Sequence, residues 1–545
     1  MVHHSKHLKL GKKHKEMDYL AGFLILSLTI SCAASTLVEN SFMKCMSNRV
    51  SDYSKSTEKT VFIKSSSLLY PKMLASLEQN PRWLNSSSKP LLIVAPSHES
   101  EIQAAILCSK EIGVHIRVRS GGHDYEGLSY KSYLCKTPFI MIDLINIRSI
   151  DINLSDETAW VQAGATLGEL YYKISKASKV HGFPAGVCPS VGVGGHFSGG
   201  GFGAMVRKHG IAADQIVDAY LIDVNGKILD KKSMGEDVFW AIRGGSATSF
   251  GVILAWKVRL VRVPHIVTVF NVQRTLEQGV TKLIHRWQYI ADKLHEDLFI
   301  RIVAQNTGAN SKTIQGQFNS LFLGQKDNLI SIMNESFPEL GLQAKDCIEM
   351  SWIQSVLYLA GYNKDDPIEL LLNRTTSYKS PFKAKSDFVQ EPIPETGLEG
   401  VWKMLLNEDT LAMLIMDPFG GKMNEISETE IPFPHRKGNL YNIQYFVKWD
   451  ENKIEESNKH IKWIRMVYQY MTPYVSKSPR ASYYNYRDLD LGSNKNGNTS
   501  YSEASVWGIN YFKRNFRRLA HIKTKFDPQN FFRNEQSIPI LNFLP

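Results

Sequence analysis

A cluster of glycines constrains this chain most, because seven of the twelve residues from 192 to 203 are glycine. Glycine loses the most backbone entropy on folding, so such a cluster is kept where the chain turns sharply or approaches a ligand closely. A second pair, Gly121-Gly122, follows the strand-like run 115–118. Neither segment matches the GxxxxGK[ST] phosphate loop or the Rossmann GxGxxG pattern. Two interpretations stay open: two tight turns in an α+β fold, or two loops whose backbone N–H groups hold a dinucleotide pyrophosphate.

The rest of the chain divides into three blocks. Residues 90–262 alternate strand-like and helix-like runs, and Asn225-Gly226 predicts a hairpin with a type I′ turn. Residues 263–475 hold fewer glycines and combine amphipathic segments with strand-like runs, whereas the tail from 476 is polar and aromatic. The runs that support these assignments are 91–94, 139–142, 280–295, 298–304 and 440–449.

The N-terminus has the pattern of a secretory signal peptide, which we place at residues 1–34. Five lysines in the first sixteen residues precede the apolar run 20–30 and a small-residue stretch. The run is shorter than the roughly 20 apolar residues of a membrane-spanning helix, and the alternative is a short N-terminal anchor. Its removal lowers the formal net charge from +11 to about +8. This charge is spread thinly over about 510 residues, so we do not expect a nucleic-acid partner.

Secretion into an oxidising compartment would allow the cysteines of this chain to form disulfides. Cys32 leaves with the signal peptide, and the remaining five cannot all pair within the chain. The chain contains no CxxC or HExxH motif, so no metal ligand set is visible. N-glycosylation sequons, which predict a glycoprotein, occur at Asn85, Asn153, Asn334, Asn373 and Asn498.

Five ordered motifs resemble the plant berberine bridge enzyme family of FAD-linked oxidoreductases: 119–124, 186–196, 243–245, 485–490 and 527–536. The similarity runs from about residue 40 to the C-terminus. It implies a two-domain α+β fold. A PCMH-type FAD-binding domain would span 35–262, and a substrate-binding domain with an antiparallel sheet and helices would span 263–475. The segment 476–545 would return to the FAD domain.

The resemblance also implies a bicovalently bound FAD. His123 matches the histidine that bonds the flavin 8α-methyl group, and Cys188 matches the cysteine that bonds flavin C6. Imidazole and thiolate are suitable nucleophiles, although a turn histidine and a buried or disulfide-bonded cysteine are the structural alternatives. The other predicted cofactor residues are Arg119, Ser120, Gly121, Gly122, Val191, Gly192, Gly194, Gly195, His196 and Gly200.

The remaining cysteines follow from the same resemblance. Cys45 and Cys108 match the family's N-terminal disulfide. Cys135 and Cys347 would then be free or paired with each other, and the sequence leaves both open.

The resemblance assigns the catalytic base to Tyr486. A phenol with a pKa of about 10 needs a nearby cation to act as a base at neutral pH, and we expect Arg487 or a residue across the pocket to supply it. The alternative is a hydrogen-bonded surface tyrosine. Val191 matches the position that gates oxygen, and its small side chain favours O2 as the final acceptor with H2O2 as a product. Gln444 shares a strand face with Asn442, as in the family's substrate sheet.

Departures from the family pattern bear on the substrate. Asn442 stands where many relatives carry Lys and cannabinoid synthases carry Glu, so activation of Tyr486 by a neighbouring lysine is in doubt. Val303 and Asp417 stand where cannabinoid synthases have His and Tyr, which argues against that activity. Two glycines of the family's Arg-Gly-Gly-Gly-Gly pattern are replaced by Ser246 and Ala247.

Two charges, Arg301 and Asp417, interrupt apolar runs. A buried charge needs a partner or a function, so we expect both side chains to line the substrate pocket and bind phenolic hydroxyls. The alternative places both on a solvated strand face.

Together these features predict a secreted, monomeric oxidase that transfers hydride from a plant phenolic, with or without a prenyl chain, to FAD. Three alternatives remain. The first is a Diels–Alderase that catalyses a [4+2] cycloaddition between a phenolic diene and a chalcone-like dienophile, with Arg301 polarising an enone. The second is a carbohydrate or monolignol oxidase, and the third is a flavin-binding remnant without turnover. We expect the apoplast or the vacuole as its location, with no stable membrane association after signal cleavage.

Overall fold

The computed structural model describes residues 36–50, 60–76, 78–83, 88–133, 138–307, 313–375, 379–451, 453–494 and 499–541. The predicted signal peptide and the residues Cys32, Asn85, Cys135 and Asn498 lie outside these ranges. No helix in the described ranges is long and apolar enough to cross a bilayer.

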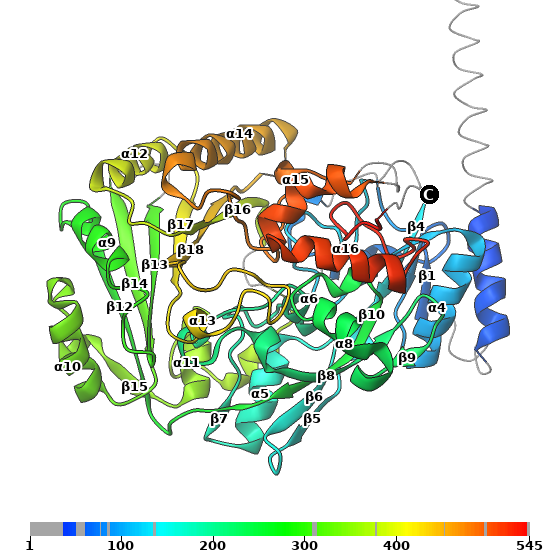
Figure 1. Cartoon of the computed structure of the whole chain (residues 1–545), viewed down its shortest axis with the longest axis horizontal. Helices are drawn as coiled ribbons and strands as arrows, with labels where there is room; N and C mark the ends of the chain where they lie inside the picture. The colour runs from blue at the N-terminus through cyan, green and yellow to red at the C-terminus, as the bar shows by residue number, and fades with distance from the viewer. Residues whose placement is uncertain are drawn as a thin grey trace, which may run out of the picture.

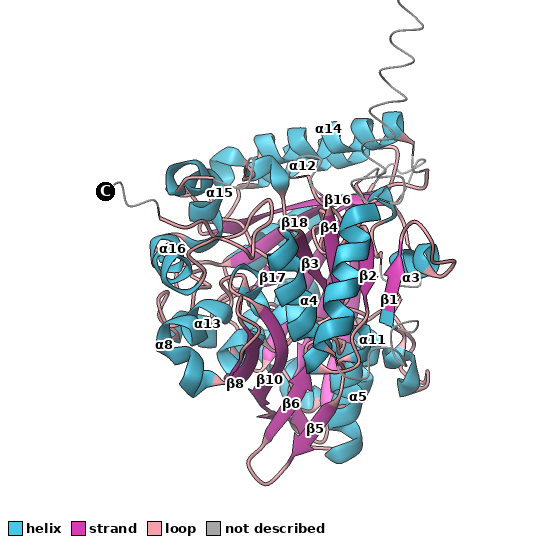
Figure 2. Ribbon diagram, turned by 90° about the vertical axis from the view of Figure 1, so that its right-hand side faces the viewer, coloured by secondary structure: helices cyan, strands magenta, loops and turns pink. Residues whose placement is uncertain are grey.

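The first sheet has four strands in the order β1 (Val61–Ile63), β2 (Leu92–Val94), β4 (Phe139–Asp143) and β3 (His115–Arg119). β2 and β3 are each parallel to β4, and fully buried runs form β2 and β4, as both faces of a parallel strand require. Helix α4 (Glu99–Ile112) connects β2 to β3 and lies against this sheet in Figure 2. The disulfide between Cys45 and Cys108 ties the N-terminal helical segment to α4, which confirms that pairing.

The second sheet is antiparallel and has five strands: β5 (Ile150–Asn153), β6 (Thr158–Gln162), β10 (Val252–Arg259), β8 (Ile216–Ile222) and β9 (Ile228–Leu229). The predicted hairpin is present between β8 and β9, but its turn is not type I′. Gly226 has a φ of +73°, whereas Asn225 is not among the residues with positive φ. The Gly226 amide donates to the Asp223 carbonyl at 3.1 Å, and the chain is closed by a turn that needs only one left-handed residue.

The third sheet is antiparallel and carries the second half of the fold. Its order is β15 (Ile348–Met350), β12 (Val267–Thr275), β14 (Ile314–Phe322), β13 (Leu298–Asn306), β17 (Ala412–Pro418), β18 (Tyr441–Lys448) and β16 (Phe382–Val389). Figure 1 shows four helices along its outer side: α9 (Val280–Gln288), α10 (Lys326–Ser336), α12 (Glu395–Leu406) and α14 (Ile454–Tyr470). Their apolar faces and the outer face of the sheet form a second hydrophobic core. The amphipathic segment expected over 280–295 is helical only as far as Gln288.

The C-terminal helices pack against the N-terminal half of the chain. α15 (Tyr501–Phe512) lies against α16 (Asn515–Phe526), and α16 contacts α8 (Lys231–Ile242), as Figures 1 and 2 show. The buried Lys523 ammonium bonds Asp527 at 2.6 Å and the Ser249 carbonyl at 2.6 Å. The domain boundaries at 262 and 475 stay predictions.

The shorter elements are α3 (Tyr70–Ser76), α5 (Leu167–Ala177), α6 (Val193–Ser198), α7 (Val206–His209), α11 (Trp352–Leu359), α13 (Lys422–Glu425), β7 (His181–Gly182) and β11 (Val261–Arg262).

Candidate active site

The two glycine segments meet back to back. A Cβ added to Gly121 would lie 2.3 Å from the Gly192 amide nitrogen, and one added to Gly192 would lie 2.2 Å from the Gly121 nitrogen. These glycines therefore allow close contact between two backbones. Gly195 differs, because a Cβ there would meet nothing within 4 Å and the residue lines a cavity. The two interpretations left open by the sequence thus apply to different glycines: a tight contact at 121 and 192, and open ligand space at 195.

The cavity has a volume of about 520 Å³ and is lined by several elements. Both glycine loops, the segment 483–487 and the residues 532–534 contribute, together with the inner face of the seven-stranded sheet. The volume lies within the roughly 300–1,000 Å³ of small-molecule and cofactor sites. An elongated ligand that reaches from the glycine loops to the sheet fits this shape. The open space in front of Gly195 is what the close approach of a dinucleotide requires.

His123 and Cys188 project into this cavity from different loops. Ser190 lies between them, with its Oγ 3.0 Å from His123 Nε2 and 3.5 Å from Cys188 Sγ. Burial lowers the pKa of His123 to about 4, so its imidazole is neutral and nucleophilic at neutral pH. Burial raises the pKa of the Cys188 thiol. A histidine and a free cysteine close together on the wall of one cavity fit the residue types that two flavin tethers need.

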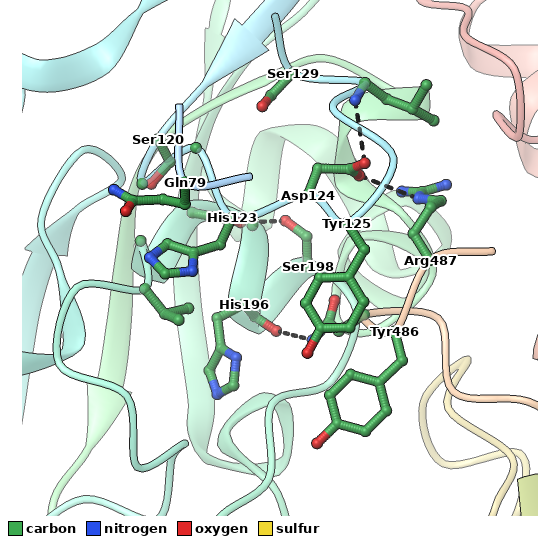
Figure 3. A pocket seen from close by; sticks show the side chains of 18 of the residues that line it. Gln79, Ser120, His123, Asp124, Tyr125, Ser129, His196, Ser198, Tyr486 and Arg487 are labelled. Atoms are coloured by element: carbon green, nitrogen blue, oxygen red, sulfur yellow. Dashed lines mark hydrogen bonds and ion pairs between the residues drawn. The ribbon is translucent and has the colours of Figure 1, made fainter. Parts of the chain in front are cut away.

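Most of the other predicted cofactor residues line the cavity. They are Ser120, Gly121, Gly122, Val191, Gly192, Gly194, Gly195 and His196. The His196 Nε2 accepts a hydrogen bond from the Gly186 amide at 3.0 Å, and burial lowers the pKa of this imidazole to about 3. Figure 3 shows the His123 and His196 rings on one side of the site and the Tyr125 and Tyr486 rings on the other.

Two predicted cofactor residues do not line the cavity. Arg119 is fully buried, and its Nη2 pairs with Asp143 at 2.6 Å and also donates to the Met73 carbonyl of α3. Its Nη1 donates to the Leu74 carbonyl of the same helix. Gly200 has a φ of +117°, and a Cβ there would lie 3.0 Å from Phe433, so this glycine serves a turn. Ser246, which replaces a family glycine, does line the cavity, with a φ of +71° and its Oγ 2.5 Å from Tyr484 Oη.

Tyr486 stacks on a residue that the sequence prediction missed. Its ring is parallel to that of Tyr125 within 7°, with centroids 5.6 Å apart. The Gln444 amide donates to Tyr125 Oη at 2.7 Å, so Gln444 holds the partner of Tyr486. Tyr125 directly follows His123-Asp124, and its place in that motif was the signal that could have found it. Burial raises the pKa of Tyr486 well above its ordinary value, Tyr125 and Asp417 raise it further, and Arg301 lowers it.

Arg301 is the cation that lowers the pKa of Tyr486. The alternative, Arg487, is turned away: its Nε lies 3.2 Å from Asp124 Oδ2 (Figure 3), and its guanidinium lies over the Tyr484 ring at 4.1 Å. Arg301 lines the cavity, while its Nε donates to Asp417 Oδ1 at 2.5 Å. Positive charge beside the phenol stabilises its deprotonated form.

Asp417 does not line the cavity, contrary to expectation. Its side chain is fully buried behind Arg301, and its Oδ2 has no hydrogen-bond partner among the described residues. The solvated strand face considered as an alternative is also excluded for both residues. Asn442 is buried next to Asp417 on the paired strand, where its Nδ2 donates to the Asp387 carbonyl. Neither Asn442 nor Val303 lines the cavity.

The sheet contributes four further lining residues that the sequence prediction missed: Phe382, Ile415, Phe446 and Lys448. Phe446 and Lys448 follow Gln444 at alternate positions of β18, so the alternation of that strand could have found them. Phe382 lies on β16, where it pairs with Lys448. No local pattern connects these two residues, which are brought together only by strand pairing.

Comparison with known proteins identifies the same scaffold. The profile of an FAD binding domain matches residues 90–231, and a profile described as "Berberine and berberine like" matches 482–539. The chain is 54% identical to "Berberine bridge enzyme-like 22" of Arabidopsis thaliana, over 97% of this chain and all of the relative. It is 51% identical to "Monolignol oxidoreductase AtBBE-like 13" of the same plant, over 96% of this chain and 97% of the relative. A crystal structure of Phl p 4, a grass pollen allergen with glucose dehydrogenase activity, is 45% identical, with a TM-score of 0.86 over 92% of this chain and 99% of the allergen.

Proposed function

Because this chain belongs to the berberine bridge enzyme-like family of FAD-dependent oxidoreductases, we propose that it is a secreted oxidase of aromatic alcohols or phenols. One observation supports this proposal above the others. A single cavity holds His123 and Cys188 on one side and the Tyr486–Arg301 pair on the other. A cofactor tethered at the first pair would face a substrate held at the second.

In this proposal each residue of the cavity has a separate role. When bound, FAD would supply the hydride acceptor and pass two electrons on to O2, and the two hydrogens lost by the substrate would balance the H2O2 formed. Tyr486 takes the proton of the substrate hydroxyl as the hydride leaves, and the Arg301 guanidinium offsets the negative charge that forms on the phenol. Gln444 fixes Tyr125, whose ring supports the Tyr486 ring. His123 and Cys188 would hold the flavin, and Val191, in the loop after Cys188, would leave room for O2.

The lining of the substrate end favours an aromatic substrate. Tyr125, Phe382 and Phe446 form much of its wall, with Ile415 beside them. Rings pack well on such a wall, whereas a sugar would leave hydroxyls without partners there. A relative named as a monolignol oxidoreductase supports the same substrate class. Carbohydrate oxidation and a redox-neutral cycloaddition remain as alternatives that the experiment below separates.

The test uses purified holoenzyme and an aryl allylic alcohol. We expect a yellow colour that survives acid precipitation, O2 uptake matched by H2O2, and a product two hydrogens lighter than the substrate. Tyr486→Phe should lower kcat/KM by about 100-fold or more, since a positioned base contributes about 10²–10⁴-fold. Tyr501→Phe, a change outside the cavity, is the matched control. Product formed without O2 uptake would favour the cycloaddition, and turnover of glucose alone would contradict the aromatic substrate.

The proposed location rests on the Cys45–Cys108 disulfide and on the sequence pattern of a signal peptide. Of the five sequons, Asn153, Asn334 and Asn373 lie in the described ranges. We propose that the chain enters the secretory pathway and acts in the apoplast or the vacuole as a monomer. Mass spectrometry of the purified plant protein, before and after deglycosylation, tests this.

A further inference from the structure

Lys448 is a cation of the cavity wall that has no counter-ion. It ends β18, two residues beyond Phe446 and on the same face as Gln444, and it is half-buried. Its ammonium has no hydrogen-bond or ion-pair partner among the described residues. Three of the four arginines that line the same cavity differ, because Arg117 pairs with Glu535, Arg301 with Asp417 and Arg487 with Asp124. The fourth, Arg533, donates to the Asn530 carbonyl.

A continuous row of rings connects Lys448 to the proposed base. The Tyr486 ring stacks on Tyr125 at 5.6 Å, and Tyr125 meets Phe382 edge to face at 5.1 Å. Phe382 stacks on Phe446 at 5.1 Å, with an angle of 25° between the rings. Phe382 also pairs with Lys448 in the register of β16 and β18. The cation therefore lies at one end of an aromatic wall whose other end is Tyr486.

Nothing in the wall neutralises this charge. The one carboxylate that lines the cavity in the described ranges, Asp124, accepts from the Glu126 and Leu128 amides and pairs with Arg487. A half-buried cation beside an apolar wall is shielded less by water than one at an open surface, so an anion that reaches Lys448 is stabilised more. An apolar ring system with an acidic group at one end matches both features.

We propose that Lys448 is a specificity-determining residue that binds the carboxylate of an aromatic substrate whose alcohol lies at Tyr486. The inference rests on the proposed oxidase function and names the substrate class for that same site. The substrate ring lies along Tyr125, Phe382 and Phe446, and the carboxylate meets the ammonium at the far end of this wall. Arg301, already paired with Asp417, stays at the reacting end.

The experiment compares two ligands that differ in one group: 4-(hydroxymethyl)cinnamic acid and its primary amide. Binding to the oxidised holoenzyme is measured by stopped flow without O2, from the change in flavin absorbance that precedes flavin reduction. We expect the wild type to bind the acid about tenfold more tightly than the amide, as a partly shielded ion pair allows. Lys448→Met should remove this preference and leave amide binding within about twofold, and Lys448→Arg should retain it. Lys462→Met, which removes an exposed lysine of α14, is the charge-matched control.

The outcomes separate this inference from the proposed function. Equal affinity for acid and amide in the wild type, or a preference for the acid that survives in Lys448→Met, would overturn the role of Lys448. Flavin reduction by either alcohol tests the oxidase independently. A preference for the acid that depends on Lys448, without flavin reduction, would support the carboxylate site and reject the oxidation.

Discussion

Replacing Asp417 by asparagine tests how the site sets the acidity of Tyr486. Burial is the largest cause that raises the pKa of this phenol, and among the charged groups Asp417 raises it while Arg301 lowers it. Asparagine keeps the size of the side chain and an oxygen that accepts from Arg301 Nε. The substitution therefore removes one negative charge and leaves the positive charge of Arg301 beside the phenol. We expect the pKa of Tyr486 to fall.

The size of this effect follows from the geometry. Two unit charges about 4 Å apart interact by about 4 kcal/mol at an effective dielectric constant of about 20. Asp417 lies behind Arg301, so we take about a third of that energy, which lowers the pKa by about one unit. The deprotonated fraction at neutral pH then rises about tenfold, and because a weaker base transfers protons more slowly, kcat/KM should rise by about threefold.

The assay is the pH dependence of kcat/KM for the holoenzyme. The rising limb of the profile should lie about one pH unit lower in Asp417→Asn than in the wild type. Breaking a buried ion pair costs about 3–5 kcal/mol of folding free energy, so the thermal midpoint should fall as well. The rates are therefore measured well below the midpoint of the variant.

A matched control is available in the same sheet. Asp387 is also fully buried and bonds an arginine, Arg480, but its charge is not among the main groups that shift the pKa of Tyr486. Asp387→Asn should lower the thermal midpoint without moving the pH profile. A rising limb that stays in place, or moves to higher pH, in folded Asp417→Asn would refute the reasoning.

Three further predictions concern stability. Cys108→Ser should lower the free energy of unfolding by about 2–5 kcal/mol in calorimetry and leave covalent flavin in place; an unchanged midpoint would contradict it. Asp488→Asn removes a carboxylate held by both Lys383 and Lys385, and should cost about 3 kcal/mol, whereas no loss would show that the network is dispensable. Burial lowers the pKa of His209 from 6.5 to about 4, so the stability it contributes is complete above pH 6.5 and is lost as the pH falls toward 4. His209→Asn should flatten that decline in the thermal midpoint, and an equally steep decline in the variant would count against it.

The local part of the site was predictable from the sequence. His123, Cys188 and the glycines around them lie in short segments, and their residue types alone indicate nucleophiles and close backbone contacts. The alternation of the strand-like run 440–449 placed Gln444 on the face of the site. These predictions needed only the order of neighbouring residues.

The sequence did not predict how deeply each side chain is buried, or which side chains from distant segments contact one another. Alternation assigns Asp417 to a face but does not say that Arg301 covers it. The motif around Arg119 suggested a cofactor contact, yet its guanidinium is neutralised by Asp143 on the neighbouring strand. The stacking of Tyr125 on Tyr486 joins two motifs that are far apart in the chain, and only the folded backbone brings them together.

Alternate residues of β18 point to opposite faces of the sheet, and the two faces differ in how well they tolerate mutation. Ile443, Tyr445 and Val447 belong to the core under the helices, and substitutions there threaten the whole domain. Gln444, Phe446 and Lys448 face the cavity, and the hydrogen bonds of the strand do not depend on which side chains they carry. A mutant library confined to these positions would sample new substrates on an unchanged scaffold. Natural divergence by the same route would let one fold serve relatives named for as different substrates as monolignols and glucose.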